Sequence, residues 1–148
     1  MKTIEELNKI RVEKKVELDL RKNTEADTRE KHILVCHGTG CTSSKSPQIL
    51  ENFNKLIKEK ELKNVRVIKT GCFGLCAKGP IVIIRPEDTF YAMVTPDDCK
   101  EIIESHIMGG KVVERLLCKD VDGKKVIKLD DLNFYKKQKR IALKNCGV

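Results

Sequence analysis

Four of the seven cysteines stand in two close pairs, and their spacing indicates metal chemistry. Cys36 and Cys41 are separated by four residues, and Cys72 and Cys76 by three, with thirty residues between the two pairs. Thiolate sulfur is the donor that iron–sulfur clusters and soft metal ions prefer. Because seven cysteines cannot all pair within one chain, disulfides alone do not account for them.

Two expected strands lead into the two pairs. Residues 32–36, HILVC, form a short apolar run that predicts a buried strand, and residues 65–70 predict another. Between them, Ser46-Pro47 indicates a helix start with Ser46 as N-cap, and apolar residues at helical spacing continue to about Leu62. This order predicts a parallel strand pair with a right-handed crossover. Both cysteine loops then leave the same edge of the sheet, where the four thiols converge.

Glycines accompany the cysteines in both loops. Gly38 and Gly40 lie in the first loop, and Gly71 and Gly74 in the second. Glycine lets the backbone approach closely and adopt positive φ, so that amide N–H groups can point at sulfur. Such N–H···S contacts stabilise an anionic cluster. The loops therefore favour an iron–sulfur cluster.

Other uses of these thiols fit the spacing less well. A structural zinc site usually shows two C-x2-C knuckles and a thioredoxin-type dithiol needs C-x-x-C, and the sequence has neither. A Rieske centre needs histidine ligands, but His37 directly adjoins Cys36. Disulfides or core thiols are the plain alternative. A structural zinc module that docks protein partners is the rival interpretation from a different functional class.

The first loop also has an incomplete dinucleotide-binding pattern. Gly38, Gly40 and Ser43 follow a strand and precede a helix, but the third position is serine in place of glycine. The second strand ends in Lys69-Thr70, where a ribose-binding acid would stand. We therefore reject a nucleotide site here.

The segment beyond the second loop predicts a hairpin and a helix. Residues 81–84 and 89–94 flank a four-residue turn, which predicts two antiparallel strands. The segment TPDD, residues 95–98, predicts a helix start, and Gly109-Gly110 its end. The whole order predicts an α/β (α+β) fold: a thioredoxin-like sheet of two parallel strands plus an antiparallel hairpin, with flanking helices.

The remaining cysteines and the histidines are not expected to bind metal. Cys99 shares an apolar helix face with Ile102 and Ile103, which predicts core packing. Cys118 and Cys146 lack partners, so a second four-thiolate cluster is not expected. The histidines are predicted to be surface or core-rim residues: His32, His37 and His106.

The N-terminal region predicts a helix over residues 3–21, because Thr3 and Glu6 form a capping-box pattern. The polar residues 21–31 predict a linker. No apolar run approaches the 18 residues of a membrane span, and no signal-peptide core follows the first residues. We therefore expect a cytoplasmic protein without direct membrane insertion, a setting in which cysteines are used for metal or redox chemistry.

The positive charge is concentrated at the C-terminus. The chain carries a net charge of +8, but residues 119–148 hold nine basic against four acidic residues, and the centre is nearly neutral. The chain has six aromatic residues and no tryptophan, which disfavours base stacking. Nucleic acid is therefore not an expected partner.

Three segments carry a resemblance to a known family. HILVCHGTGCTSS, KTGCFGLCAKGPIVIIRP and TPDDCKEIIESHIMGGKVVERLL resemble thioredoxin-like [2Fe–2S] ferredoxins. They are most similar to the ferredoxin domain at the N-terminus of the flavin- and NADH-binding subunit of NADH dehydrogenases and of NAD-reducing or electron-bifurcating iron hydrogenases. The tail, FYKKQKRIALKNCG, resembles the opening of the adjoining flavin domain.

The resemblance implies a one-electron transfer domain whose cluster ligands fall on Cys36, Cys41, Cys72 and Cys76. The resemblance covers about residues 32–148 and implies a ferredoxin domain (32–110) and a basic linker (111–148) leading into a missing flavin domain. The N-terminal helical segment and linker (1–31) precede it. The implied partners are other subunits or domains of an NADH dehydrogenase or hydrogenase complex. FMN and NADH would bind only in the full-length subunit, so this chain is not expected to oxidise NADH by itself.

Overall fold

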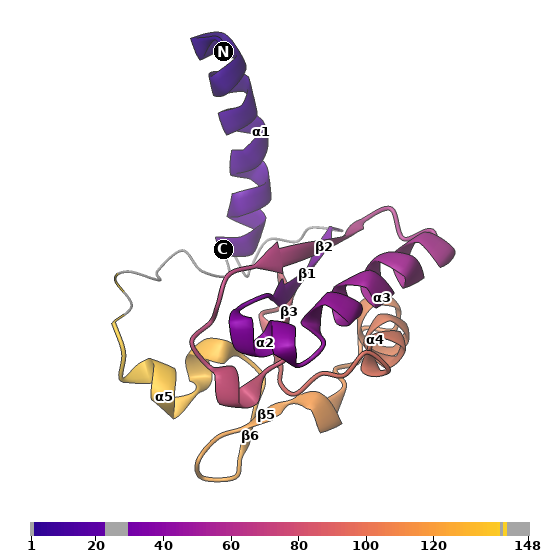
Figure 1. Cartoon of the computed structure of the whole chain (residues 1–148), viewed down its shortest axis with the longest axis vertical. Helices are drawn as coiled ribbons and strands as arrows, with labels where there is room; N and C mark the ends of the chain where they lie inside the picture. Colours follow the sequence, from indigo (N-terminus) through magenta and orange to yellow (C-terminus); the bar gives the residue numbers. More distant parts are fainter. Residues whose placement is uncertain (1, 23–29, 140, 142–148) are drawn as a thin grey trace.

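The chain is described here by a computed structural model that covers residues 2–22, 30–139 and 141. Figure 1 shows a central sheet with helices beside it and a long N-terminal helix that stands apart. Four strands form the sheet, in the order β2-β1-β3-β4. Their bounds are Lys31–Cys36 for β1, Val65–Thr70 for β2, Val82–Arg85 for β3 and Thr89–Tyr91 for β4.

The strand pairing confirms the expected fold class. β1 and β2 are parallel, and Cys36 lies opposite Thr70 at their carboxyl ends. β3 runs antiparallel on the other side of β1, and β4 runs antiparallel to β3. The second hairpin strand is shorter than the predicted 89–94, because Met93 takes a left-handed φ of 54° and Val94 N–H donates to the Pro80 carbonyl. The thioredoxin-like arrangement of one parallel pair plus a hairpin is thus present.

Two helices cover one face of the sheet. They are α3 (Ser46–Glu59) and α4 (Asp98–Glu101), and a π-helical segment, η2 (Ile102–Met108), continues α4. α3 packs on β1 and β2 through its apolar stripe, and Ile49 and Phe53 are fully buried. Alternate residues of the strands complete this core, as the two-residue period of a strand requires. They are Ile33, Val35, Val82, Ile84 and Tyr91.

The opposite face of the sheet has a second core, which includes part of the C-terminal segment. The sheet contributes the other alternation: Leu34, Cys36, Ile83 and Phe90. Phe73, from the loop after β2, packs against them together with Val126, Leu132 and Tyr135. The cysteine loops therefore leave the sheet on the side that the C-terminal segment covers.

The C-terminal segment consists of short elements. They are η3 (Glu114–Leu116), β5 (Cys118–Lys119), β6 (Lys125–Val126), η4 (Leu129–Asp131) and α5 (Asn133–Lys136). Ala92 N–H donates to the Leu116 carbonyl at 3.0 Å and Phe90 N–H to the Ile127 carbonyl at 2.7 Å. The first part of the expected linker is thus folded along β4. The domain boundary at residue 110 stays a prediction.

The predicted start of the helix that follows the first cysteine loop is one residue off. Ser46 is not the N-cap but the first residue of α3, and Lys45 precedes it with a left-handed φ of 70°. The Ser46 hydroxyl donates to the Cys36 carbonyl, a tertiary contact that replaces the expected cap. The helix ends at Glu59 and not near Leu62, because the chain turns at Glu61, whose φ is 50°.

The predicted helix after the hairpin is present, but it begins at Asp98 with Asp97 as N-cap, and Thr95 and Pro96 form the turn before it. The Asp98 carboxylate accepts hydrogen bonds from Thr95 N–H and from the Thr95 hydroxyl, both at 2.7 Å, which holds the turn before α4. Gly109 follows the last residue of η2, as predicted.

The N-terminal helix is α1 (Ile4–Lys22), and its predicted capping box is present. Thr3 N–H donates to the Glu6 carboxylate at 2.8 Å, and Glu6 N–H donates to the Thr3 hydroxyl at 3.2 Å. Its apolar side chains Ile4, Leu7 and Val12 are exposed. In the part of the chain that the structure describes, no helix is long and apolar enough to cross a membrane. Residues 23–29 of the expected linker lie outside the described residues.

Candidate metal centre

The four paired cysteines come from four different backbone settings. Cys36 is the last residue of β1, and Cys41 lies in α2 (Thr39–Ser43), a short helix in the first loop. Cys72 lies in the loop after β2, and Cys76 begins η1 (Cys76–Lys78), a 3-10 turn. Since Cys36 is opposite the end of β2, the parallel pair brings both loops to one edge of the sheet.

The thiols lie in two neighbouring pairs, Cys41 beside Cys36 and Cys76 beside Cys72. Burial, followed by the hydrogen bond with the Cys36 thiol, raises the pKa of Cys41 to about 12. The hydrogen bond with the Cys72 thiol raises the pKa of Cys76. The raised pKa values of Cys41 and Cys76 mean that metal binding has to displace protons from these two thiols.

The two pairs also face each other. A Cβ placed on Gly38 would lie 3.1 Å from Cys72 Sγ, and one on Gly40 would lie 3.6 Å from Cys76 Sγ. A Cβ on Gly79 would lie 2.7 Å from Cys41 Sγ. The first loop is thus in contact with the sulfurs of the second, and the second with a sulfur of the first. The convergence that the sequence predicts is present.

The glycines act chiefly by leaving room. We expected both close approach and positive φ, but among the glycines of these loops positive φ occurs only at Gly74, with φ 81°. The N–H of Gly74 donates to Cys72 Sγ at 3.3 Å, which is the predicted type of N–H···S contact. Gly38 has an ordinary extended φ of −65°, so a side chain there would crowd Cys72 without straining the backbone.

The two pairs differ in exposure. Cys36 and Cys41 are buried at 1% and 2% exposed, whereas Cys72 is half-buried and Cys76 is exposed. The second core covers the buried pair, Cys36 and Cys41, whereas the pair of Cys72 and Cys76 is accessible to solvent. A group bound between them has one insulated side and one accessible side.

The donor set fits a two-iron cluster. Among the residues that the structure describes, no group of three or more histidine, cysteine, aspartate or glutamate side chains is placed to hold a single metal ion. The four thiols stand as two pairs, and a [2Fe–2S] cluster takes two thiolates on each of its two irons. A structural zinc ion takes four ligands around one point. The paired arrangement therefore suits the cluster better than zinc.

The other cysteines are not members of these two thiol pairs. Cys99 is buried beneath α3 and its thiol points to the Ile49 carbonyl at 3.7 Å, in agreement with the predicted core packing. Cys118 is buried in the second core, and its thiol points to the Lys119 carbonyl at 3.6 Å. Cys146 lies outside the described residues.

The prediction for two histidines was wrong. His32 and His106 are almost completely buried, and only His37 is partly accessible. The ring of His106 forms a 2.8 Å hydrogen bond between Nδ1 and the Tyr91 hydroxyl, which allows burial of both groups. His37 Nδ1 lies 3.3 Å from the Ser46 hydroxyl, beside the first cysteine loop.

Two features of the site were missed by sequence reasoning. α2 has only five residues, too few for a helical period to show. The hydroxyl of Tyr135 donates to the carbonyl of Phe73, which directly follows Cys72. That contact joins positions far apart in the sequence, and no local pattern signals it.

Comparisons with known proteins agree with this geometry. Residues 21–106 match the family model for the thioredoxin-like [2Fe-2S] ferredoxin. The chain is 44% identical over 94 residues to a 2Fe-2S ferredoxin of Clostridium pasteurianum, covering 57% of this chain and 92% of that protein. It is 36% identical over 97 residues to a 2Fe-2S ferredoxin of Aquifex aeolicus (strain VF5), covering 59% and 87%. A crystal structure of the wild-type thioredoxin-like [2Fe-2S] ferredoxin from Aquifex aeolicus superposes with a TM-score of 0.55 at 31% identity, covering 60% of this chain and 96% of that one.

Proposed function

Because the chain belongs to the thioredoxin-like [2Fe–2S] ferredoxin family of iron–sulfur electron carriers, we propose that Cys36, Cys41, Cys72 and Cys76 are its four cluster ligands. The observation that carries this assignment is the meeting of two thiol pairs at one edge of the sheet, with the glycines of each loop against the sulfurs of the other. A cluster bound there supplies one-electron chemistry and makes no bond to a substrate.

For this function the protein has to hold the cluster, keep water from part of it and stabilise the charge on its ligands. The buried pair, Cys36 and Cys41, keeps water from one side of the site, and the exposed Cys76 leaves the other side open for electron exchange. The N–H of Gly74 donates to Cys72 Sγ and stabilises negative charge on that sulfur. We expect electrons to enter and leave at the Cys76 side.

We further propose that the chain relays electrons to or from other subunits or domains of an NADH dehydrogenase or NAD-linked iron hydrogenase complex in the cytoplasm. Support comes from the resemblance of the tail, from residue 134 onward, to the opening of a flavin domain. FMN and NADH would bind in that further domain. The curated relatives reported above are named only as ferredoxins, so this complex is a proposal of our own.

Metal analysis tests the ligand assignment. Chain purified without oxygen should contain about two irons and two acid-labile sulfides and be coloured, whereas a zinc module would be colourless and free of sulfide. Replacing any one of the four ligands by alanine should abolish normal loading. Cys99→Ala is the matched control, because Cys99 is a buried thiol outside the site. It should keep the cluster and lose about 1 kcal/mol of folding stability.

The same measurements can overturn the assignment. Bound zinc without sulfide, a native-like cluster in Cys72→Ala, or loss of the cluster in Cys99→Ala would each contradict it. For the complex, NADH turnover with an artificial acceptor should be absent in this chain, because hydride chemistry needs a flavin. Turnover by the purified chain would contradict that part of the proposal.

A further inference from the structure

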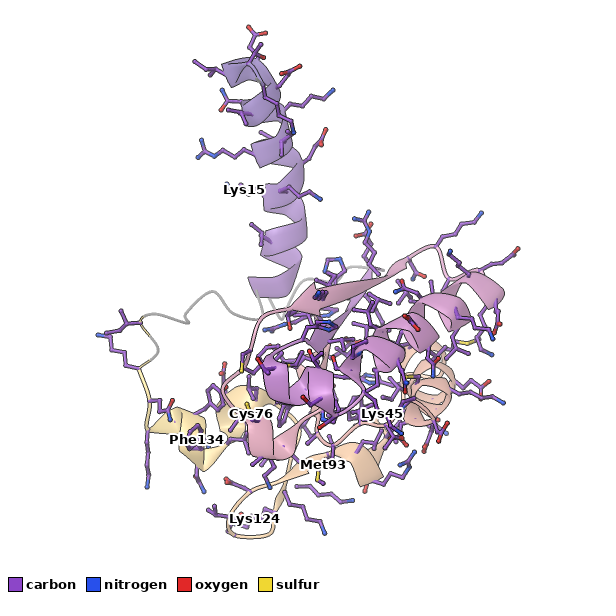
Figure 2. The ribbon with its side chains drawn as sticks, viewed as in Figure 1. Lys15, Lys45, Cys76, Met93, Lys124 and Phe134 are labelled. Carbon is purple, nitrogen blue, oxygen red and sulfur yellow. The ribbon has the colours of Figure 1, made fainter. Side chains whose placement is uncertain are left out.

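Tyr135 connects the C-terminal segment to the second cysteine loop. Its hydroxyl donates to the Phe73 carbonyl, and both side chains are buried. Figure 2 labels Cys76 on the loop and Phe134, the neighbour of Tyr135, on α5. The Phe73 carbonyl belongs to the Phe73–Gly74 peptide group, whose N–H donates to Cys72 Sγ. This hydrogen bond therefore fixes a peptide group that contacts a proposed ligand.

Further contacts hold the loop on both sides of Cys76. Phe73 packs into the second core with Leu132 and Val126, and Leu75 packs against the same core. Lys78 Nζ donates to the Lys119 carbonyl at 3.3 Å. The loop is thus tied to the C-terminal segment before Cys76 and after it.

The C-terminal segment is itself well anchored. The Asp120 carboxylate accepts hydrogen bonds from Asn133 N–H at 3.0 Å and from Val121 N–H at 2.8 Å, which joins α5 to the end of β5. Phe90 N–H donates to the Ile127 carbonyl at 2.7 Å, which fixes the segment to β4. The hydrogen bond of Tyr135 therefore connects the second cysteine loop to a segment that is itself hydrogen-bonded to the sheet.

The C-terminal partners in these contacts lie beyond the part of the chain that the family model matches, which ends at residue 106. We propose that residues 118–136 are part of the cluster-binding site, with Tyr135 as the positioning residue of the second cysteine loop. The inference rests on the proposed function, since it concerns the same four ligands. Tyr135 does not touch a sulfur in this role; it holds Cys72 and Cys76 where they meet Cys36 and Cys41.

The two tyrosines of the chain allow a matched test. Tyr135→Phe removes the hydroxyl at Phe73. Tyr91→Phe removes another buried hydroxyl, which accepts from Val113 N–H at 3.0 Å and pairs with His106 in the opposite core. In the loaded protein, iron loss to a chelator should be about fivefold faster in Tyr135→Phe, the factor that one hydrogen bond of ordinary net strength is worth. The electron paramagnetic resonance spectrum of the reduced protein should also shift or broaden in that variant.

Tyr91→Phe should keep the wild-type rate of iron loss and the wild-type spectrum, even where its folding stability falls. Equal rates in all three proteins, or equal acceleration in both variants, would overturn the inference. Amide exchange in the metal-free chain gives a readout that does not depend on the cluster. Residues 72–76 should exchange faster in Tyr135→Phe alone, and unchanged exchange there would overturn the positioning role. A wild-type chain that binds no iron would contradict the proposed function, while the exchange result would still decide the role of Tyr135.

Discussion

Replacing Gly79 by alanine should displace Cys41 without unfolding the chain. The new Cβ would lie 2.7 Å from Cys41 Sγ and 3.3 Å from the Cys76 carbonyl oxygen, whereas ordinary contact begins at 3.4 Å. The thiol or the loop must therefore move by several tenths of an ångström. Because Cys41 is 2% exposed, its side chain cannot turn outward into solvent.

The expected size of the effect follows from the cost of overpacking. Inserting a methyl group into a packed region costs about 1–3 kcal/mol. We expect about 2 kcal/mol for Gly79→Ala, because the contact meets a buried thiol and a backbone carbonyl and neither is a flexible side-chain end. Urea unfolding of the metal-free chain measures this loss. Iron and sulfide content should also fall clearly below wild type, since one ligand no longer sits with its pair.

Alanine substitutions at two other glycines distinguish the effect of steric crowding from the effect of backbone strain. A Cβ on Gly40 would lie 3.6 Å from Cys76 Sγ, so Gly40→Ala should load iron nearly as the wild type does. Gly74 has a φ of 81° with nothing within 4 Å of its Cβ position, so Gly74→Ala should cost about 1–2 kcal/mol through strain alone and keep its cluster. Normal iron content in Gly79→Ala, or equal loss in Gly40→Ala, would refute the crowding argument.

Two predictions concern pH. Burial opposes ionisation of Asp98, but hydrogen bonds from Thr95 and Arg115 outweigh it and lower the pKa of Asp98. The contribution of the ionised Asp98 carboxylate to folding stability is therefore complete above about pH 4 and is lost as the pH falls through the lowered pKa. Asp98→Asn should cost about 1 kcal/mol near neutral pH and flatten the acid side of a urea-unfolding series, and an unchanged acid side would contradict this. Burial and then the charge of Lys31 lower the pKa of His106, against an opposing effect of Glu87. Stability should therefore fall as the pH drops through about 6.5, the unfolded-state value, and a His106→Gln chain that keeps this slope would show that another group titrates.

The sheet and the meeting of the cysteine loops could be predicted because they follow from local patterns. The strand at residues 32–36 shows as a continuous apolar run and the helix between the strands shows a helical period. The handedness of the crossover then places both loops at one edge. The convergence of Cys36 and Cys72 needed no knowledge of side-chain packing. It needed only the parallel pair.

The features that were missed depend on contacts between distant residues. Ser46 carries an N-cap pattern, but its hydroxyl donates to the Cys36 carbonyl across the loop. His106 is a polar residue on an apolar face, and its burial becomes possible through the Tyr91 hydroxyl. Residues 114–136 form elements too short to show a period, so the burial of Tyr135 leaves no trace in the local sequence.

Formation of the cysteine site also depends on the correct register of β1 with its neighbouring strands. In β1, Cys36 shares its face with Leu34, while Ile33 and Val35 point to the helices. A strand that slips by one position exchanges its two faces. Such a slip would turn Cys36 toward α3 and leave Cys41 without its partner. The loaded site can therefore form only on a correctly aligned sheet, and loss of colour would report misalignment before any loss of helix or strand content.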